Sequence, residues 1–218
     1  MDFSYISNLM PTLLEGAVTT TGLFLIVILC SLPLGFLITL MLRSKIAPLR
    51  WIANVYVYIL RGTPLLLQLF FIYFGLPYLP VIGKYLVFES FTAAVIGFVI
   101  NYAAYFAEIY RGGLIAIPKG QYEAAKVLGL NKFQTMTRII VPQMVRVALP
   151  SITNESVTLV KDTSLLYAVA VPEILHYAKA AVISSANPTA FAVAAVIYLV
   201  MNTLLTLLFK KLEKKMEY

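Results

Sequence analysis

Five long apolar runs limit this chain to folds that a lipid bilayer can surround. They cover about residues 16–42, 64–81, 91–110, 145–166 and 189–209. Each is close to the roughly 20 residues that a helix needs to cross about 30 Å of hydrocarbon. We therefore predict an all-α integral membrane protein with five transmembrane helices.

The composition agrees with a membrane protein and argues against a soluble one. Hydrophobic residues make up 61% of the 218 residues and charged residues only 12%, against about 45–50% and about 25% in soluble domains. These charges cluster between the apolar runs and are too few to cover a globular surface. The net charge of +7 has no solvated basic face for nucleic acid, so we expect no nucleic-acid partner and a bilayer as the surroundings.

Lys and Arg are distributed unevenly between the loops, and this predicts an orientation. They gather in three segments after the first, third and fifth runs, at 43–50, 111–146 and 210–215. Lys84, Lys161 and Lys179 fall near the opposite side. Because positively charged loops favour the cytoplasm, we expect the N-terminus outside and the C-terminus inside. The N-terminal segment has no early Lys or Arg, unlike a cleaved signal peptide, so we expect the first helix to be retained.

Two regions do not fit a simple crossing. Residues 51–60 are apolar and aromatic, and suit either an interfacial segment or the first part of one long kinked helix. Thr63 is a good N-cap and Pro64 a good first helical residue, which favours a new helix at this point. Residues 164–185 contain several polar groups and suit an outer-facing helix or a re-entrant segment that lines a cavity.

Few residues in the chain offer metal or nucleophile chemistry. Cys30 is the only cysteine and His176 the only histidine. One cysteine excludes an intrachain disulfide and a thiolate metal site. Because the carboxylates are scattered, we find no metal motif and no nucleophile–base arrangement. We predict neither catalytic residues nor a metal site.

The loop segment at about 118–142 has strong local helix signals. Pro118 can begin a helix, and Gly129 is placed to end it in a left-handed conformation. Asn131 and Gln134 have the spacing of a capping box for a second helix. The predicted structure is a helix, a glycine turn and a second helix on the cytoplasmic side. These signals alone leave open whether the segment is a connector or a contact surface.

The residues of this segment also match a family signature. Glu123-Ala124-Ala125, Gly129, Ile139 and Pro142 stand at the spacings of the cytoplasmic motif of ABC importer permeases, with Val141 in place of leucine. The chain resembles the polar amino acid uptake permeases, such as those for arginine, glutamine or histidine, from about residue 16 to the C-terminus. Further matches are Arg61-Gly62-Thr63-Pro64 with Gln68, residues 107–113, Gly120-Gln121 and residues 161–165.

This resemblance implies a fold, a function and partners. It implies a type I ABC importer permease-like fold in a bacterial inner membrane, with residues 1–218 as a single transmembrane permease domain. Glu123, Ala124, Ala125 and Gly129 would couple to a separate ATPase subunit that binds ATP and magnesium, since this chain has no Walker A motif. A second permease copy, as a homodimer, and an extracytoplasmic solute-binding protein would complete the importer. The substrate would be a polar amino acid, arginine first, then histidine, lysine or glutamine.

Polar residues at membrane depth predict where the substrate binds. Glu155 and Asn101 each lie about 15 Å from a flanking arginine by helical rise, near the midplane. Asn154 and Thr158 lie close to Glu155 along the same helix. A carboxylate there suits a guanidinium or ammonium group, but Glu155 can instead pair with Lys161 or stay protonated.

Other features of these helices support structural roles. Glu108 and Arg111, three residues apart, favour a structural or gating pair. The alanines at 103, 104 and 107 and those in 190–195 suit close helix contact, either within the chain or against a second copy.

Rival functions have weaker support in the sequence. A secondary transporter that works without an ATPase often shows internal repeats with broken helices, and we find no convincing repeat. A channel subunit would need an element like a selectivity filter, and none is recognisable.

Overall fold

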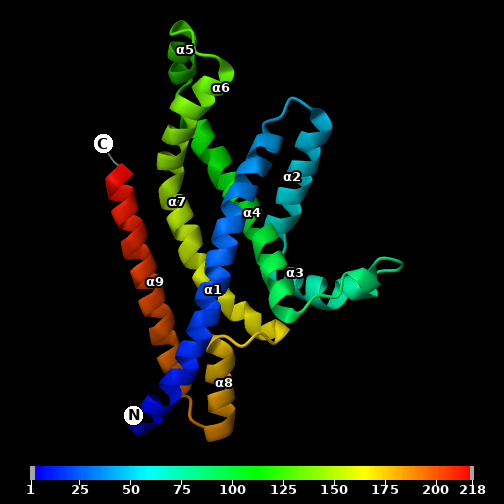
Figure 1. The fold of residues 1–218 in the computed structure, drawn as a ribbon, viewed down its shortest axis with the longest axis vertical. Coiled ribbons are helices and arrows are strands. Elements are labelled where there is room, and N and C mark those ends of the chain that lie inside the picture. The colour runs from blue at the N-terminus through cyan, green and yellow to red at the C-terminus, as the bar shows by residue number, and fades with distance from the viewer. Residues whose placement is uncertain (1–2, 217–218) are drawn as a thin grey trace.

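The computed structural model describes residues 3–216, and in this range the secondary structure is entirely helical. The predicted fold class is therefore confirmed. Helices α1, α2, α4, α7, α8 and α9 form the bundle in Figure 1, and short helical turns join them. In chain order the elements are α1 (Phe3–Leu42), α2 (Ala47–Gly62), α3 (Leu65–Phe70), η1 (Phe71–Gly75), η2 (Leu76–Tyr78), η3 (Gly83–Tyr85), α4 (Ser90–Ala116), α5 (Lys119–Val127), α6 (Lys132–Gln134), η4 (Thr135–Ile140), α7 (Val141–Asp162), η5 (Thr163–Val169), α8 (Ile174–Ser185) and α9 (Thr189–Met216).

Three helices in the described range are long and apolar enough to cross a membrane alone, namely Ser4–Leu42, Ser90–Ala116 and Thr189–Met216. Two bent helix pairs raise the number to five if each pair is one span. Residues 47–62 and 65–78 form one pair, bent by 107°, and residues 132–169 and 174–185 form the other, bent by 54°. The predicted five crossings therefore hold only if both broken pairs are counted.

Helix α4 lies at the centre of the molecule, and α1 packs along it. Ala103, Ala104 and Ala107 are fully buried. A Cβ on Gly35 of α1 would lie 2.9 Å from the Ala103 carbonyl oxygen, and Thr39 Oγ1 donates to the Ala107 carbonyl at 2.9 Å. The small residues of α4 thus serve contact within the chain. Ala190 and Ala194 of α9 are likewise buried, in a cluster with α1 and α8.

The segment predicted to cross at 64–81 is not a straight helix of its own, because the chain bends by 107° before it and the segment turns away from the bundle (Figure 1). Helix α2 runs beside α1 and α4 with Ala53 and Val57 buried, and the next helix begins only at Leu65. Thr63 adopts extended backbone (φ −121°, ψ 146°), as expected for the residue before a proline. Pro64 therefore occupies the cap position predicted for Thr63. Residues 51–60 belong to a packed helix, which excludes a purely interfacial segment.

Residues 164–185 form a 3₁₀ stretch, a left-handed turn at Ala170 (φ 57°) and helix α8. The buried Glu173 carboxylate caps α8 by accepting hydrogen bonds from the backbone N–H groups of Leu175 at 2.7 Å and His176 at 2.6 Å. The Tyr198 hydroxyl of α9 donates to the same carboxylate at 2.8 Å. This segment is a separate, tightly held helix rather than a continuation of α7.

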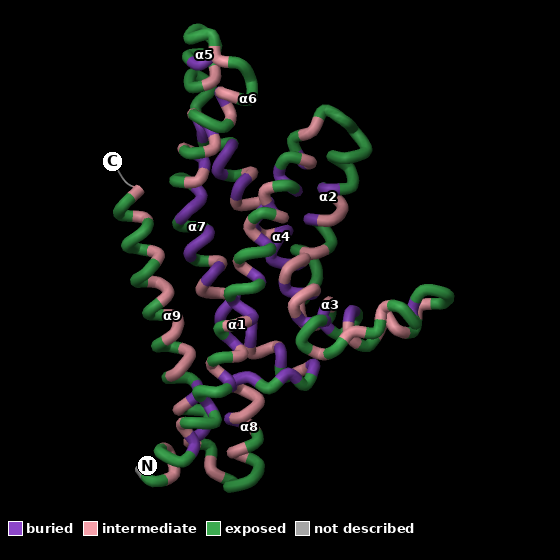
Figure 2. Tube along the Cα trace, viewed as in Figure 1, coloured by how far each residue is buried: buried purple, intermediate pink, exposed green. Residues whose placement is uncertain are grey.

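Different elements form the two ends of the molecule, and the helices between them differ in exposure. Helices α5 and α6 and the loop between α1 and α2 lie at one end, and the N-terminal part of α1 and helix α8 lie at the other (Figure 1). Buried residues concentrate in α4 and α7, whereas α9 is mostly exposed (Figure 2). The exposed side chains of α9 include Leu199, Leu204 and Leu208, which suits a helix that faces lipid.

Candidate functional site

A charged cavity of about 380 Å³ lies between α2, α4 and α7. Arg61 comes from the C-terminal end of α2, Tyr105 and Glu108 from α4, and Ser151 and Glu155 from α7. Backbone at Gly112 and Gly113 and the side chains of Ile109, Val147 and Ala148 complete the lining. Charged groups at this position on membrane helices are costly unless they are paired or face water, so the cavity is the candidate site.

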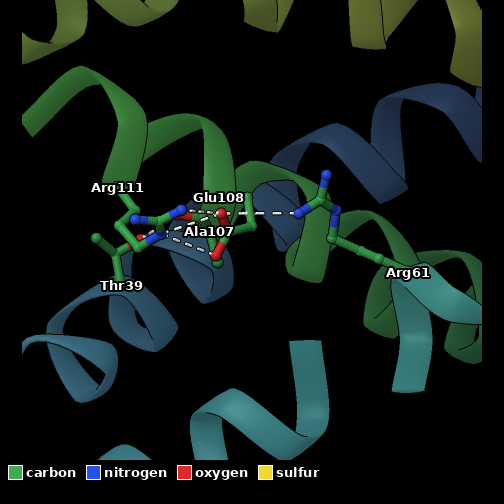
Figure 3. A network of polar contacts seen from close by, with 5 residues as sticks. All are labelled: Thr39, Arg61, Ala107, Glu108 and Arg111. Atoms are coloured by element: carbon green, nitrogen blue, oxygen red, sulfur yellow. Dashed lines mark hydrogen bonds and ion pairs between the residues drawn. The ribbon is translucent and has the colours of Figure 1, made fainter. Parts of the chain in front are cut away.

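Glu108 is the most connected charge in the cavity (Figure 3). Arg111 Nε donates to both Glu108 oxygens at 3.0 Å, and Arg111 Nη2 lies 2.7 Å from Oε2. Arg61 approaches Glu108 Oε2 from α2, with its Nη1 at 3.7 Å. This confirms the predicted contact between Glu108 and Arg111 and adds Arg61 to it. The bidentate salt bridge to Glu108 fixes the Arg111 side chain. Arg61 makes only one longer contact with Glu108.

Arg61 is the cavity residue that sequence reasoning did not assign to the site. Its guanidinium carbon lies 5.3 Å from the centre of the Tyr105 ring, a cation–π contact. Its side chain is 42% exposed, which leaves donor groups free for a ligand. An arginine at the end of an apolar helix is a signal of function. This signal could have identified Arg61 as a site residue from the sequence.

Glu155 lies in the cavity, half-buried, on the side opposite Glu108. Within residues 3–216 it makes no salt bridge, so the expected alternative of an ion pair with Lys161 is not seen. The neighbouring acid Asp162 instead accepts a hydrogen bond of 2.7 Å from the Tyr102 hydroxyl of α4. Glu155 is therefore a carboxylate that lines the cavity without a salt bridge among the described residues, and Arg61 of the same cavity is the cation whose charge acts on it.

Asn101 does not lie in the cavity. Its amide is buried and donates to the Leu60 carbonyl at 3.1 Å and to Gln68 Oε1 at 3.0 Å. Gln68 Nε2 in turn donates to Leu60 at 2.9 Å and to Thr63 Oγ1 at 2.9 Å. These bonds hold the bend between α2 and α3, so the described contacts of Asn101 are with this bend and not with the cavity.

Asn154 and Thr158 lie outside the cavity, on the exposed face of α7 next to Glu155. Asn154 is exposed, and Thr158 Oγ1 donates to its carbonyl at 3.1 Å. With Ser151 and Lys161 they form a polar stripe along α7, in which Ser151, Asn154 and Lys161 are exposed and Thr158 is half-buried. The structure thus places Asn154 and Thr158 beside Glu155 and separates Asn101 from them.

The segment around α5 has the local structure that its sequence predicts. Gly129 has φ +74°, and Leu130 N–H donates to the Ala125 carbonyl while Gly129 N–H donates to Lys126, the bonds of a Schellman motif. Asn131 and Gln134 form the predicted capping box.

The exposed side of α5 is mixed in character. Glu123 and Ala124 are exposed, whereas Ala125 is buried against the rest of the chain. Val127, Leu128 and Phe133 are more than 70% exposed at the tip of the molecule. This end therefore presents apolar side chains with a carboxylate beside them.

Residues 3–216 contain no group of three or more His, Cys, Asp or Glu side chains that could hold a metal ion. The single cysteine, Cys30, is exposed on α1. The chemistry of the described cavity is therefore that of charged and hydroxyl groups.

Comparison with known proteins shows the family to which this chain is similar. The family profile described as "Binding-protein-dependent transport system inner membrane component" matches residues 31–218. The arginine transport system permease protein ArtQ of Bacillus subtilis (strain 168) is 36% identical, over 100% of this chain and 98% of its own. A putative glutamine transport system permease protein GlnP of Rickettsia felis is 37% identical, over 98% of each chain. A solved structure of an amino acid ABC transporter with histidines has a TM-score of 0.89 and 30% identity, over 99% of both chains.

Proposed function

Because the chain belongs to the family of binding-protein-dependent transport system inner membrane components and is the permease subunit of an amino-acid ABC transporter, we propose that its charged cavity is the substrate site of an importer for polar amino acids. The observation that carries this proposal is the placement of Arg61 and Glu155 in one cavity of about 380 Å³. Small-molecule sites have volumes of about 300–1,000 Å³. Arg61 offers donors to a carboxylate, and Glu155 offers an acceptor to a cationic group.

A basic amino acid fits this cavity best. The relatives are named for arginine and for glutamine, so family membership leaves the substrate open. Glu155 makes no salt bridge among the described residues, and a guanidinium or ammonium group of the substrate would supply one. Tyr105 adds a ring face for a cation. We place arginine first, then histidine, lysine and glutamine.

A second copy of the chain would complete the pathway. The polar stripe of α7 is exposed at Ser151 and Asn154 and half-buried at Thr158 in the single chain, and a polar stripe at membrane depth does not face hydrocarbon without cost. A homodimer that joins the two stripes would enclose them around water and substrate. In this arrangement Asn154 and Thr158 line the pathway beside Glu155.

Helix α5 supports contact with an ATPase subunit, to which we assign ATP and magnesium. Glu123 and Ala124, with Val127 and Leu128, form the exposed surface that would dock. Ala125 is buried at the base, and Gln143 of α7 donates to Gln121 of α5 at 3.3 Å. Since α7 also carries Glu155, movement of α5 would reach the cavity through one connected element.

The proposed orientation puts α5 in the cytoplasm of a bacterial inner membrane, with the N-terminus outside. The segments 43–50, 111–146 and 210–215, which are rich in Lys and Arg, support it. A solute-binding protein would then deliver the amino acid to the end formed by α8 and the start of α1.

The decisive experiment measures uptake of radiolabelled arginine and glutamine by proteoliposomes that contain this chain with its ATPase, in the presence of the solute-binding protein. Glu155→Gln is expected to lower ATP-driven arginine uptake about tenfold, the loss of one charged hydrogen bond, and glutamine uptake much less. The matched control is Glu89→Gln, which removes one exposed carboxylate outside the cavity and should leave both rates unchanged.

Two results would contradict the proposal. Equal loss of arginine and glutamine uptake in Glu155→Gln would remove Glu155 as the anchor for the cation. Uptake that proceeds without ATPase or ATP would indicate a secondary transporter or a channel subunit instead.

A further inference from the structure

The bend between α2 and α3 forms a second cavity, of about 520 Å³, and this one is apolar. Its lining is mainly aliphatic, with Leu60 from α2, Leu67, Phe71 and Ile72 from the segment after the bend, and Ile96 and Ile100 from α4. None of its described lining residues is charged.

No side-chain hydrogen-bond donor among the described residues of this cavity is left for a polar ligand. Gln68 and Thr63 are its only hydrogen-bonding side chains in the described chain. Gln68 Nε2 donates to Leu60 and Thr63, and Gln68 Oε1 accepts from Asn101. Thr63 Oγ1 also donates to the Ile59 carbonyl at 2.9 Å. The cavity therefore suits an apolar ligand, because its lining is otherwise apolar and a polar ligand would find no free side-chain donor among the described residues.

The apolar cavity and the charged cavity lie on different sides of α4. At 100° per residue, Ile96 and Ile100 lie about 150° around α4 from Tyr105, Glu108, Ile109 and Gly112, which line the charged cavity. If the charged side faces the pathway and a second copy, the apolar cavity faces the bilayer. The assignment of the charged side of α4 to the pathway rests on the proposed function.

The segment after the bend has the features of a membrane interface. It leaves α2 at 107° and projects sideways from the bundle (Figure 1), so it lies nearly parallel to a membrane that α2 crosses. Tyr78 and Tyr85 at its end are 87% and 74% exposed, and Lys84 Nζ lies 4.8 Å from the Tyr85 ring centre. Tyrosine and lysine with apolar stems are typical of the headgroup level.

We propose that the cavity at the bend binds an acyl chain of a phospholipid whose headgroup lies beside Tyr78, Lys84 and Tyr85. The acyl chain fills the cavity between α2 and α4 and contacts its aliphatic lining. The segment after the bend covers the acyl chain from the headgroup side. The bend is then held by the Asn101–Gln68 hydrogen bonds on its inside and by lipid on its outside.

The test uses the whole transporter, with its ATPase, in vesicles of phosphatidylethanolamine and phosphatidylglycerol. The probe is a phosphatidylglycerol that carries a photoreactive diazirine in its acyl chain, and mass spectrometry maps the adducts. Adducts are expected to concentrate at 60–72 and 96–100, several-fold above the exposed lipid-facing residues 199–208 of α9. Ile100→Trp, which fills the cavity, should abolish that excess, whereas Leu204→Trp on α9 should preserve it.

The proposal is overturned if the bend is labelled no more than α9, or if Ile100→Trp keeps the excess. It is also overturned if Leu67→Cys forms a disulfide between two copies in a Cys30→Ala background, because a second copy would then cover the cavity. Ile96→Phe gives a milder filling should Ile100→Trp fail to assemble. ATP-driven uptake in the same vesicles separates the two proposals: normal uptake without excess labelling overturns the lipid site alone.

Discussion

Gly16 of α1 lies against the backbone of Ile174, so closely that a Cβ at position 16 would come within 2.6 Å of the Ile174 nitrogen. The same methyl group would lie 2.7 Å from the Glu173 carbonyl carbon. Real Cβ atoms do not approach backbone this closely, so only glycine fits. The contact seats α1 on the break before α8, where Glu173 caps the helix.

Gly16→Ala is therefore expected to destabilise the subunit by about 1–3 kcal/mol, the usual cost of overpacking. Gly22→Ala is the matched control, because it lies in the same helix and a Cβ there meets nothing within 4 Å. It should be neutral or stabilise by up to about 1 kcal/mol. Thermal unfolding of the purified subunit in detergent measures both. Equal melting temperatures for the two variants would mean that α1 does not press on this backbone.

Local structure proved predictable where the relevant residues are neighbours in sequence. The Gly129 turn and the Asn131 capping box depend on residues at most six positions apart. The break at Thr63–Pro64 was predicted, but the direction of the segment after it was not, since the bend is held by Asn101 and Gln68, which are 33 residues apart. Nothing in the sequence near Asn101 indicates that its amide is already bonded.

The candidate site was predictable in part for a related reason. Glu155, Glu108 and Arg111 are recognisable because charge in an apolar run is rare. Arg61 follows an apolar stretch whose path was uncertain, and its approach to Glu108 depends on how α2 packs on α4. Tertiary packing thus decided which polar residues share a cavity.

Glu108 and Arg111 should contribute jointly, and not independently, to the stability of the subunit. Glu108→Gln leaves two arginines without their carboxylate, and Arg111→Gln leaves Glu108 with only the long contact to Arg61. Each single change is expected to cost stability, and the double variant less than the sum of the two, by about 1 kcal/mol or more. A double-mutant cycle on thermal unfolding measures this difference. Additive losses would show that the pair is not coupled.

Asn101 and Asn154 offer a contrast between a structural and an exposed amide. Asn101→Ala removes the donor to Leu60 and Gln68 and is expected to cost about 1–3 kcal/mol of stability. Asn154→Ala, on the exposed face of α7, should melt like the unmodified subunit and change only uptake. If Asn101→Ala keeps its stability but loses substrate affinity, Asn101 acts on the substrate and not on the bend.

The proposed orientation predicts which residues can be labelled from outside an intact cell. In a Cys30→Ala background, Ser184→Cys lies in α8, and Lys132→Cys lies in α6 at the opposite end of the molecule. Both positions are exposed. A membrane-impermeant maleimide should label Ser184→Cys in intact cells and Lys132→Cys only after permeabilisation. The reverse pattern would invert the topology.

The turn after α5 should decide how well the chain couples to its ATPase. Gly129 has φ +74°, a conformation that costs an L-residue about 1–2 kcal/mol, whereas the φ of Gly120 in α5 lies outside the left-handed region. A Cβ at either position meets nothing within 4 Å, so the two substitutions differ only in backbone strain. Gly129→Ala is therefore expected to loosen the turn, weaken ATPase binding in a pull-down and lower the uptake per ATP hydrolysed. Gly120→Ala should leave both unchanged, and a Gly129→Ala chain that binds and couples normally would show that the ATPase does not depend on this turn.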